Sequence, residues 1–302
     1  MHAKRPRRLL VIADDFGIGV DTTAGILELA ACGVVTGSVL LVNAPAAVEG
    51  IRQWRRLGAP LELGWHPNLT LDSPLAPPAQ VPSLVRPDGA FWPLGPFLKR
   101  WLVGRLAPRE IHLELTLQLR RFIDLVGHPP RFVNSHQHIA LFPPIGKILL
   151  QVLGKLGIRP YVRRVQEPWS VVVKLPGARL KRIFLSCLGR RMTRIQEAHG
   201  FPGNDWLAGI SNPRMAADSR FFTRRLLMMP GQVVELMCHP GHYDATLVGR
   251  DCTASDGLLQ QRVNELRWLQ ESAFVEAVKD AGFQLTTPSE LPSGTRARIG
   301  CA

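Results

Sequence analysis

The chain has 302 residues, 46% of them hydrophobic, with a formal net charge of +13 and a pI near 10.4. This apolar content is enough for one large domain with a sizeable core, and it excludes a disordered or low-complexity chain. The positive charge permits contact with nucleic acid or with an anionic membrane. The sequence has no helix-turn-helix, RRM or zinc-finger spacing, so we expect no nucleic-acid partner.

Cysteine usage and the N-terminal residues indicate a cytoplasmic protein. The five cysteines are scattered and form no CxxC pair, which excludes a disulfide framework and suits a reducing compartment. The basic start is followed by only a short apolar run before two acids, too short for the core of a signal peptide. No window reaches the roughly 18 apolar residues of a membrane span.

The apolar run Leu9–Ala13 predicts a buried strand, which two adjacent acids, Asp14 and Asp15, follow directly. In α/β sheets and barrels, functional sites are built at this carboxyl end of the strands. Neighbouring strand residues point in different directions, so the two acids can serve two roles. A plainer alternative is that one of them caps the next helix.

Strands and helices then alternate along the chain, while residues 72–93 are dense in proline and glycine and predict no regular element. The expected elements are a strand over 9–13, a helix from Asp21 or Thr22 to about Cys32, a strand over 37–43, a helix over 45–57, a strand over 61–65, a helix over 108–125, a strand over 131–134, a helix over 143–157, a strand over 232–237, a helix over 256–281 and a strand over 283–286.

This alternation is typical of a parallel sheet with right-handed crossovers. About seven strand–helix units favour an α/β, barrel-like (β/α) fold over a doubly wound sheet. We expect a single domain over 1–302, with a basic insertion at about 165–215. Residues 163–194 hold nine Lys or Arg against one acid, Glu167. These cations are either a solvated face or a contact for an anionic membrane surface, a substrate or a partner protein.

Polar residues recur where the predicted strands end. Asp14 and Asp15 follow the first strand, and His66, His136 and His239 follow later ones. The carboxyl ends of parallel strands converge in space, so these side chains should meet. One carboxylate and two imidazoles make a hydrolytic metal site with open positions for water and substrate. We therefore expect Asp15, His66 and His136 to be metal ligands, Asp14 a general base and His239 a general acid.

Five motifs stand in order along the chain: ADDFG at 13–17, TGSVLLVN at 36–43, GWHPNLT at 64–70, SHQH at 135–138 followed by Phe142 and Pro143, and ELMCHPG at 235–241. Together they resemble the YdjC/ChbG family of carbohydrate deacetylases, over nearly the whole chain except the basic insertion. The resemblance implies a barrel-like fold, one divalent metal ion and removal of an acetyl group from an N-acetylated sugar.

Carried over residue by residue, the resemblance implies the same ligands, Asp15, His66 and His136. It also implies Asp14 as the base and His239 in the site. The sequence departs from the family pattern at Asn134, often Asp, and at Ala140, often His, which could alter substrate contacts or the groups that orient the ligands. A resemblance to hopanoid-associated members would suit a substrate at a membrane surface.

For the substrate, we expect contacts from His138 and from at least one of Trp65, Trp92 and Trp101, because indole faces stack on sugar rings. The metal is Mg²⁺ or Zn²⁺, and the ligand types leave the choice open. Two alternatives to deacetylation remain, a non-catalytic sugar- or lipid-binding relative and a phosphoesterase on the same metal site. The sequence also leaves a homodimer open.

Overall fold

The computed structural model describes residues 6–291, and its centre is the long strand β1 (Arg7–Phe16). One edge of β1 pairs along Arg8–Ala13 with β7 (Val233–Cys238). The other edge is shared by β8 (Phe283–Leu285) beside the first residues of β1 and β2 (Gly37–Leu40) beside its end. All of these pairings are parallel, so the strand ends lie on one side of the sheet.

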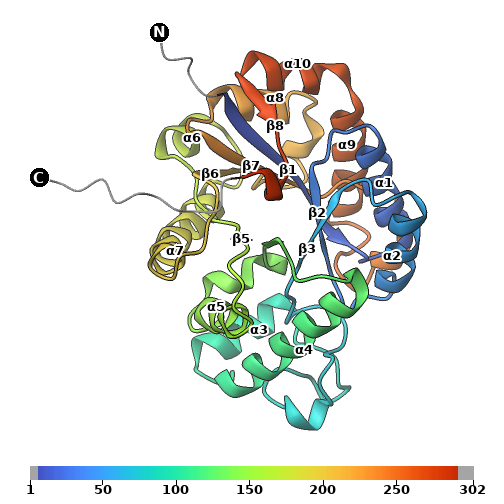
Figure 1. The fold of residues 1–302 in the computed structure, drawn as a ribbon, viewed down its shortest axis with the longest axis vertical. Coiled ribbons are helices and arrows are strands. Elements are labelled where there is room, and N and C mark those ends of the chain that lie inside the picture. The colour runs from blue at the N-terminus through green and yellow to red at the C-terminus, as the bar shows by residue number, and fades with distance from the viewer. Residues whose placement is uncertain (1–5, 292–302) are drawn as a thin grey trace, which may run out of the picture.

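The sheet has eight strands within the described residues, in the order β5-β4-β3-β2-β1-β7-β6, with β8 attached to β1. Backbone hydrogen bonds also link the two ends of this order, since Val162 N donates to Pro202 O at 2.8 Å and Leu207 N donates to Gln166 O at 2.9 Å. The curled, parallel sheet confirms the barrel-like α/β prediction (Figure 1). The remaining strands are β3 (Glu62–Trp65), β4 (Phe132–Val133), β5 (Tyr161–Val162) and β6 (Trp206–Ala208).

Helices surround this sheet (Figure 1), with α1 beside α2 and α9, α4 beside α5, and α10 between α8 and β8. Their bounds are α1 Val20–Ala31, α2 Ala47–Arg56, α3 Leu94–Leu102, α4 Pro108–Val126, α5 Ile145–Lys155, α6 Trp169–Lys174, α7 Arg179–Ala198, α8 Phe221–Met228, α9 Leu258–Gln270 and α10 Ser272–Asp280.

The interior of the barrel is narrow and is filled by side chains. Alternate residues of β1 face opposite sides, so Leu10 and Ile12 pack inward with Phe132, while their neighbours pack under the helices. A Cβ atom added at Gly64 would lie 2.6 Å from the Phe132 ring, and one at Gly37 would lie 2.9 Å from it. Glycine at these two strand positions therefore makes room for Phe132.

The start of the chain differs from prediction in its capping. Helix α1 begins at Val20 with Gly19 as the N-cap residue, so neither Asp21 nor Thr22 caps it. Asp14 and Asp15 lie within β1 itself, which rules out the plainer interpretation of this doublet as a helix cap. Strand β2 ends at Leu40, three residues before the predicted end.

Other differences concern short or interrupted elements. The helix predicted over 256–281 is two helices, because Glu271 is extended (φ −73°, ψ 140°) and α10 turns to pack on α8 and β8. Helix α3 and strands β5 and β6 were not predicted. The span expected as an insertion contains α6 and α7, but its residues 206–208 form β6 and pair with β7. Residues 206–208 therefore belong to the sheet. Among residues 6–291, no helix combines the length and apolarity needed to span a bilayer.

Candidate metal centre

The predicted metal ligands come together at the carboxyl ends of three strands. Asp15 stands near the end of β1, His66 directly follows β3, and His136 begins a 3₁₀ turn just after β4. All three are buried, and their ligand atoms lie within 4.8 Å of one another. Asp15 adopts φ +70°, a left-handed conformation that is rare outside glycine and typical of residues held in place for function.

The three side chains fit a small divalent cation. Oδ1 of Asp15 lies 3.3 Å from Nε2 of His66 and 3.1 Å from Nδ1 of His136. Tetrahedral ligands about 2.0–2.1 Å from a zinc ion are themselves separated by about 3.3 Å. The two distances from Oδ1 of Asp15 are therefore those expected between ligands of one ion.

A backbone carbonyl sets the tautomer of His66. The carbonyl oxygen of Asn134 can only accept, so Nδ1 of His66 donates to it at 2.9 Å and carries the proton. Nε2 is then the nitrogen that faces Asp15 and that would bind a metal ion. Asn134 thus contacts His66 through its backbone carbonyl.

Asp15 is also held on its outer side by Arg262 of α9. Nη2 of Arg262 donates to Oδ2 of Asp15 at 2.6 Å and to Oδ2 of Asp251 at 3.0 Å. Burial alone would raise the pKa of Asp15, but Arg262 and the two imidazoles hold it well below its ordinary value. Oδ1 of Asp251 lies 3.7 Å from Nε2 of His136, so Asp251 borders the far side of that ring.

Asp14, the neighbouring acid, has a different partner. Both of its carboxylate oxygens accept hydrogen bonds from the Arg163 guanidinium, at 2.6 and 2.7 Å, and Nδ2 of Asn134 donates to Oδ1 at 3.2 Å. Burial opposes ionisation of Asp14, yet the Arg163 charge and hydrogen bonds lower its pKa below the ordinary value. Arg163 also pairs with Glu235, so one buried guanidinium serves two carboxylates.

His239 lies on the Asp14 side of the site, with its Nε2 3.9 Å from Oδ2 of Asp14. Its side chain is 29% exposed, so it remains reachable from solvent, unlike the two imidazoles of the triad. Its backbone N–H donates to Oε2 of Glu265 at 2.6 Å, which fixes the end of β7 against α9.

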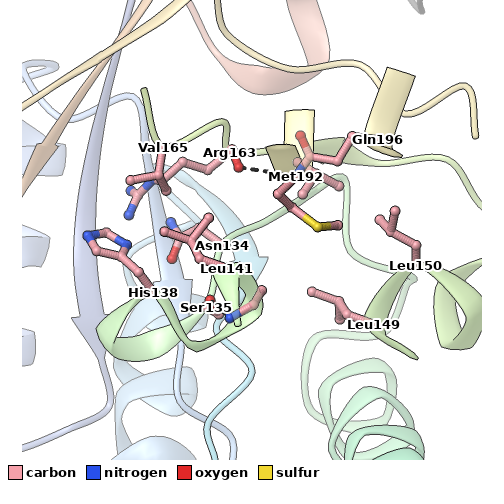
Figure 2. Close-up of a pocket in the computed structure, with 12 residues that line it drawn as sticks. Asn134, Ser135, His138, Leu141, Leu149, Leu150, Arg163, Val165, Met192 and Gln196 are labelled. Atoms are coloured by element: carbon pink, nitrogen blue, oxygen red, sulfur yellow. Dashed lines mark hydrogen bonds between the residues drawn. The ribbon is translucent and has the colours of Figure 1, made fainter. Parts of the chain in front are cut away.

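His138 lies beside the site, in a small cavity of about 20 Å³ that it shares with Asn134, Arg163 and Gln196 (Figure 2). Such a volume has room for about one water molecule. Burial and the nearby Arg163 charge lower the pKa of His138 to about 3, so this ring is neutral. A neutral imidazole at this place can donate or accept a hydrogen bond.

Trp65 does not take the predicted substrate role. It is fully buried in the core, so its indole face is not exposed for a sugar ring to stack on. Its position at the last residue of β3, directly before His66, makes it a packing residue that fixes the strand end. The other two candidates, Trp92 and Trp101, are both partly buried against the core.

The sequence did not predict the two arginines that bind the adjacent acids, Arg163 on Asp14 and Arg262 on Asp15. Arg163 is the first of the nine cations of the basic segment 163–194, and it directly follows β5. Arg262 lies on the buried face of α9 with Leu259, Leu266 and Leu269. A lone arginine within this apolar stripe was the available signal for a buried ion pair.

Comparisons with known proteins identify the family of this chain. The family model described as YdjC-like protein matches residues 8–280. A chitooligosaccharide deacetylase of Klebsiella pneumoniae (strain 342) is 30% identical over 289 residues, covering 93% of this chain and 98% of its own. A carbohydrate deacetylase of Mus musculus is 35% identical over 305 residues, covering 95% of each chain.

Among solved structures, the chain resembles a putative cellobiose-phosphate cleavage protein from Enterococcus faecalis V583. The TM-score is 0.77, with 22% sequence identity, over 94% of this chain and 98% of the other. At this identity the likeness concerns the fold.

Proposed function

Because this chain belongs to the YdjC-like family, we propose that it hydrolyses the N-acetyl group of an acetamido sugar, an oligosaccharide or a glycolipid. The observation that carries the proposal is the approach of two imidazole nitrogens to one carboxylate oxygen, Oδ1 of Asp15, at ligand spacing. The deacetylase names of the relatives at 30–35% identity support the same reaction.

Asp15, His66 and His136 would hold the metal ion, His66 through Nε2 and His136 through Nδ1. A divalent cation, when bound, lowers the pKa of a coordinated water and polarises the amide carbonyl. Two imidazoles with one carboxylate suit Zn²⁺ better than Mg²⁺, which prefers oxygen ligands and keeps several waters. Arg262 fixes the outer oxygen of Asp15, so that the inner oxygen stays turned towards the two imidazoles.

Asp14 is the general base. It is ionised, because Arg163 lowers its pKa, and it can therefore accept the proton of the attacking water at once. Arg163 also limits how basic the carboxylate is and fixes its plane through the paired hydrogen bonds. Asn134 binds the same carboxylate, so the orientation of the base is set by two neighbours.

His239 is the general acid. It must give a proton to the nitrogen that leaves as the sugar amine, and its partial exposure lets a substrate reach its ring. Nε2 of His239 lies 3.9 Å from Oδ2 of Asp14, so the proposed acid and base are neighbours in the site. The neutral His138 would hydrogen-bond the substrate.

Acetate release from N-acetylglucosamine oligomers and from N-acetylated glycolipids tests the proposal. We expect release by the whole protein, its loss with chelator, and its return when Zn²⁺ is added. The variant His242→Ala is a matched control, because His242 is an exposed histidine that pairs with Glu28 outside the triad. Acetate release that chelator leaves unchanged would contradict the mechanism. Sugar binding without release would indicate a binding protein, and phosphate release from sugar phosphates a phosphoesterase.

A further inference from the structure

Large apolar side chains are exposed side by side on two neighbouring helices, α6 and α7. Trp169 and Val173 of α6 are 46% and 64% exposed, and Leu180 and Phe184 of α7 are 83% and 53% exposed. A soluble helix normally turns such residues inward. We call these four residues, with the exposed cations around them, the α6–α7 surface.

The outer face of α7 is apolar at one end and cationic at the other. Leu180, Phe184, Arg191 and Arg194 follow one another at intervals of four, seven and three residues, which places them on one face of a helix. All four are exposed. This one face of α7 therefore has an apolar N-terminal part and a cationic C-terminal part.

Helix α6 borders this face. The Arg190 guanidinium lies 5.2 Å from the centre of the Trp169 ring, and Nη2 of Arg179 donates to the carbonyl of Val173 at 3.1 Å. Arg179 and Arg190 are eleven residues, about three turns, apart and share one side of α7. The exposed residues of α6 thus lie along the edge of the α7 face.

Only some of the nine cations of residues 163–194 are exposed and available to a partner. Arg163, Arg164 and Arg182 are buried and pair with acids, so they do not contribute to the α6–α7 surface. No Asp or Glu occurs in the sequence from 168 to 196. The exposed cations that remain are Lys174, Arg179, Lys181, Arg191 and Arg194.

Aromatic contacts extend the apolar part towards α3. The Phe142 ring lies 6.5 Å from Phe184 and 5.0 Å from Trp101, measured between ring centres. Leu102 and Val103, at the end of α3, are also exposed. The buried Phe142 ring therefore packs between Phe184 of α7 and Trp101 of α3.

We propose that the α6–α7 surface docks on an anionic lipid bilayer, a property that goes beyond the proposed hydrolysis and does not depend on it. Leu180, Phe184 and Trp169 would enter the boundary between headgroups and acyl chains, while the surrounding Lys and Arg meet anionic headgroups. Nucleic acid would use the cations but gain nothing from exposed leucine and valine side chains. A symmetric contact with a second copy would set these cations against one another.

Docking would bring the catalytic site close to the membrane. Met192 and Gln196, on the inner side of α7, line the same cavity as His138 and Arg163 (Figure 2). The outer face of α7 is thus about one helix diameter, roughly 10–12 Å, from the site. A sugar carried on a lipid headgroup would be within reach.

Flotation of the whole protein with vesicles tests this inference. We expect binding to vesicles of phosphatidylcholine with phosphatidylglycerol, weaker binding at high salt, and little binding to phosphatidylcholine alone. The double variant Leu180→Ser with Phe184→Ser should lower the partition coefficient by about tenfold or more. Arg191→Glu with Arg194→Glu should lower it similarly on anionic vesicles only. Leu227→Ser, at a position 55% exposed on α8, is the matched control and should bind like the unchanged protein.

Circular dichroism and an unchanged melting temperature check that each variant is folded. The inference is overturned if the protein floats with neither kind of vesicle, or if neither double variant binds less. Binding to DNA with no vesicle binding would make the surface a nucleic-acid contact. Self-association that Leu180→Ser with Phe184→Ser abolishes, again without vesicle binding, would make it an interface between copies.

Discussion

Two adjacent and chemically identical carboxylates have different environments because each is held by a different arginine. Arg163, next to β5, binds both oxygens of Asp14, whereas Arg262 of α9 binds only the outer oxygen of Asp15. Asp15 thus keeps one oxygen free for two imidazoles. The left-handed φ of Asp15 turns it away from the regular alternation of β1. The backbone conformation at the end of β1 and the two arginines together give Asp15 the environment expected of a metal ligand and Asp14 that expected of a base.

At the level of single residues, the two imidazoles should be needed for metal binding. We expect His66→Ala and His136→Ala each to weaken metal affinity at least tenfold, since loss of an outer-shell partner alone costs about 10–100-fold. Metal content after dialysis measures the effect, with His242→Ala as the control. Full occupancy in both triad variants would show that the ligands are assigned wrongly.

The convergence of the candidate site residues could be predicted, because each stands where a predicted strand ends. Asp14, Asp15, His66, His136 and His239 each follow an apolar run, and parallel strands bring such positions together. The arginine partners could not be predicted in the same way. Arg163 stands among other arginines in the sequence, and only burial distinguishes it from its solvated neighbours.

At the level of secondary structure, α7 is anchored by a buried ion pair. Arg182 of α7 is fully buried and pairs with Glu167, and its Nη1 donates to the carbonyl of Leu175 at 2.9 Å. Arg182→Met would leave the buried carboxylate of Glu167 paired with Arg225 at 3.9 Å.

We expect this substitution to lower the free energy of unfolding by about 3–5 kcal/mol, as for other buried pairs that lose one partner. Arg191→Met, on the exposed face of the same helix, should change it by no more than about 0.5 kcal/mol. Urea denaturation of both variants provides the comparison. Equal stability of the two would mean that the ion pair does not anchor α7.

Long elements with a clear period were predictable, and short or interrupted ones were not. Helix α4 shows apolar residues at helical spacing over five turns, whereas β5 has two residues and β6 three, too few for any period. Helix α3 begins directly after Pro93 and carries Pro96 in its first turn. Because prolines are dense in this part of the sequence, no helix was predicted there. The break at Glu271 contains no proline or glycine and follows from tertiary packing of α10.

At the scale of the whole molecule, the parallel pairing of the strands within residues 6–291 explains why residues from 14 to 239 come close together. Sequence alternation was sufficient to predict this architecture. It could not predict that β8 and β2 share one edge of β1, or that the sheet curls until backbone bonds join its ends. Those features depend on strand twist and packing rather than on local sequence.

Metal binding should also stabilise the folded molecule as a whole. A ligand that binds only the native state at 100 times its Kd adds about 2.7 kcal/mol to the free energy of unfolding. We expect Zn²⁺ to raise stability by this order relative to chelator, and His66→Ala to lose the difference. Denaturation curves with and without metal measure it. Identical curves for the unchanged protein would argue against a resident metal.

Metal content and acetate release, measured on the same preparations of Asp14→Asn and Asp15→Asn, test the central claim most directly. Asp14→Asn should be folded and metal-bound, with kcat lowered by about 10²–10⁴-fold, because a general base has been removed. Asp15→Asn should be metal-poor, because the carboxylate ligand has been removed. If Asp14→Asn loses the metal while Asp15→Asn keeps it, the roles are reversed. If Asp14→Asn keeps full activity on a proven substrate, the hydrolytic mechanism is wrong.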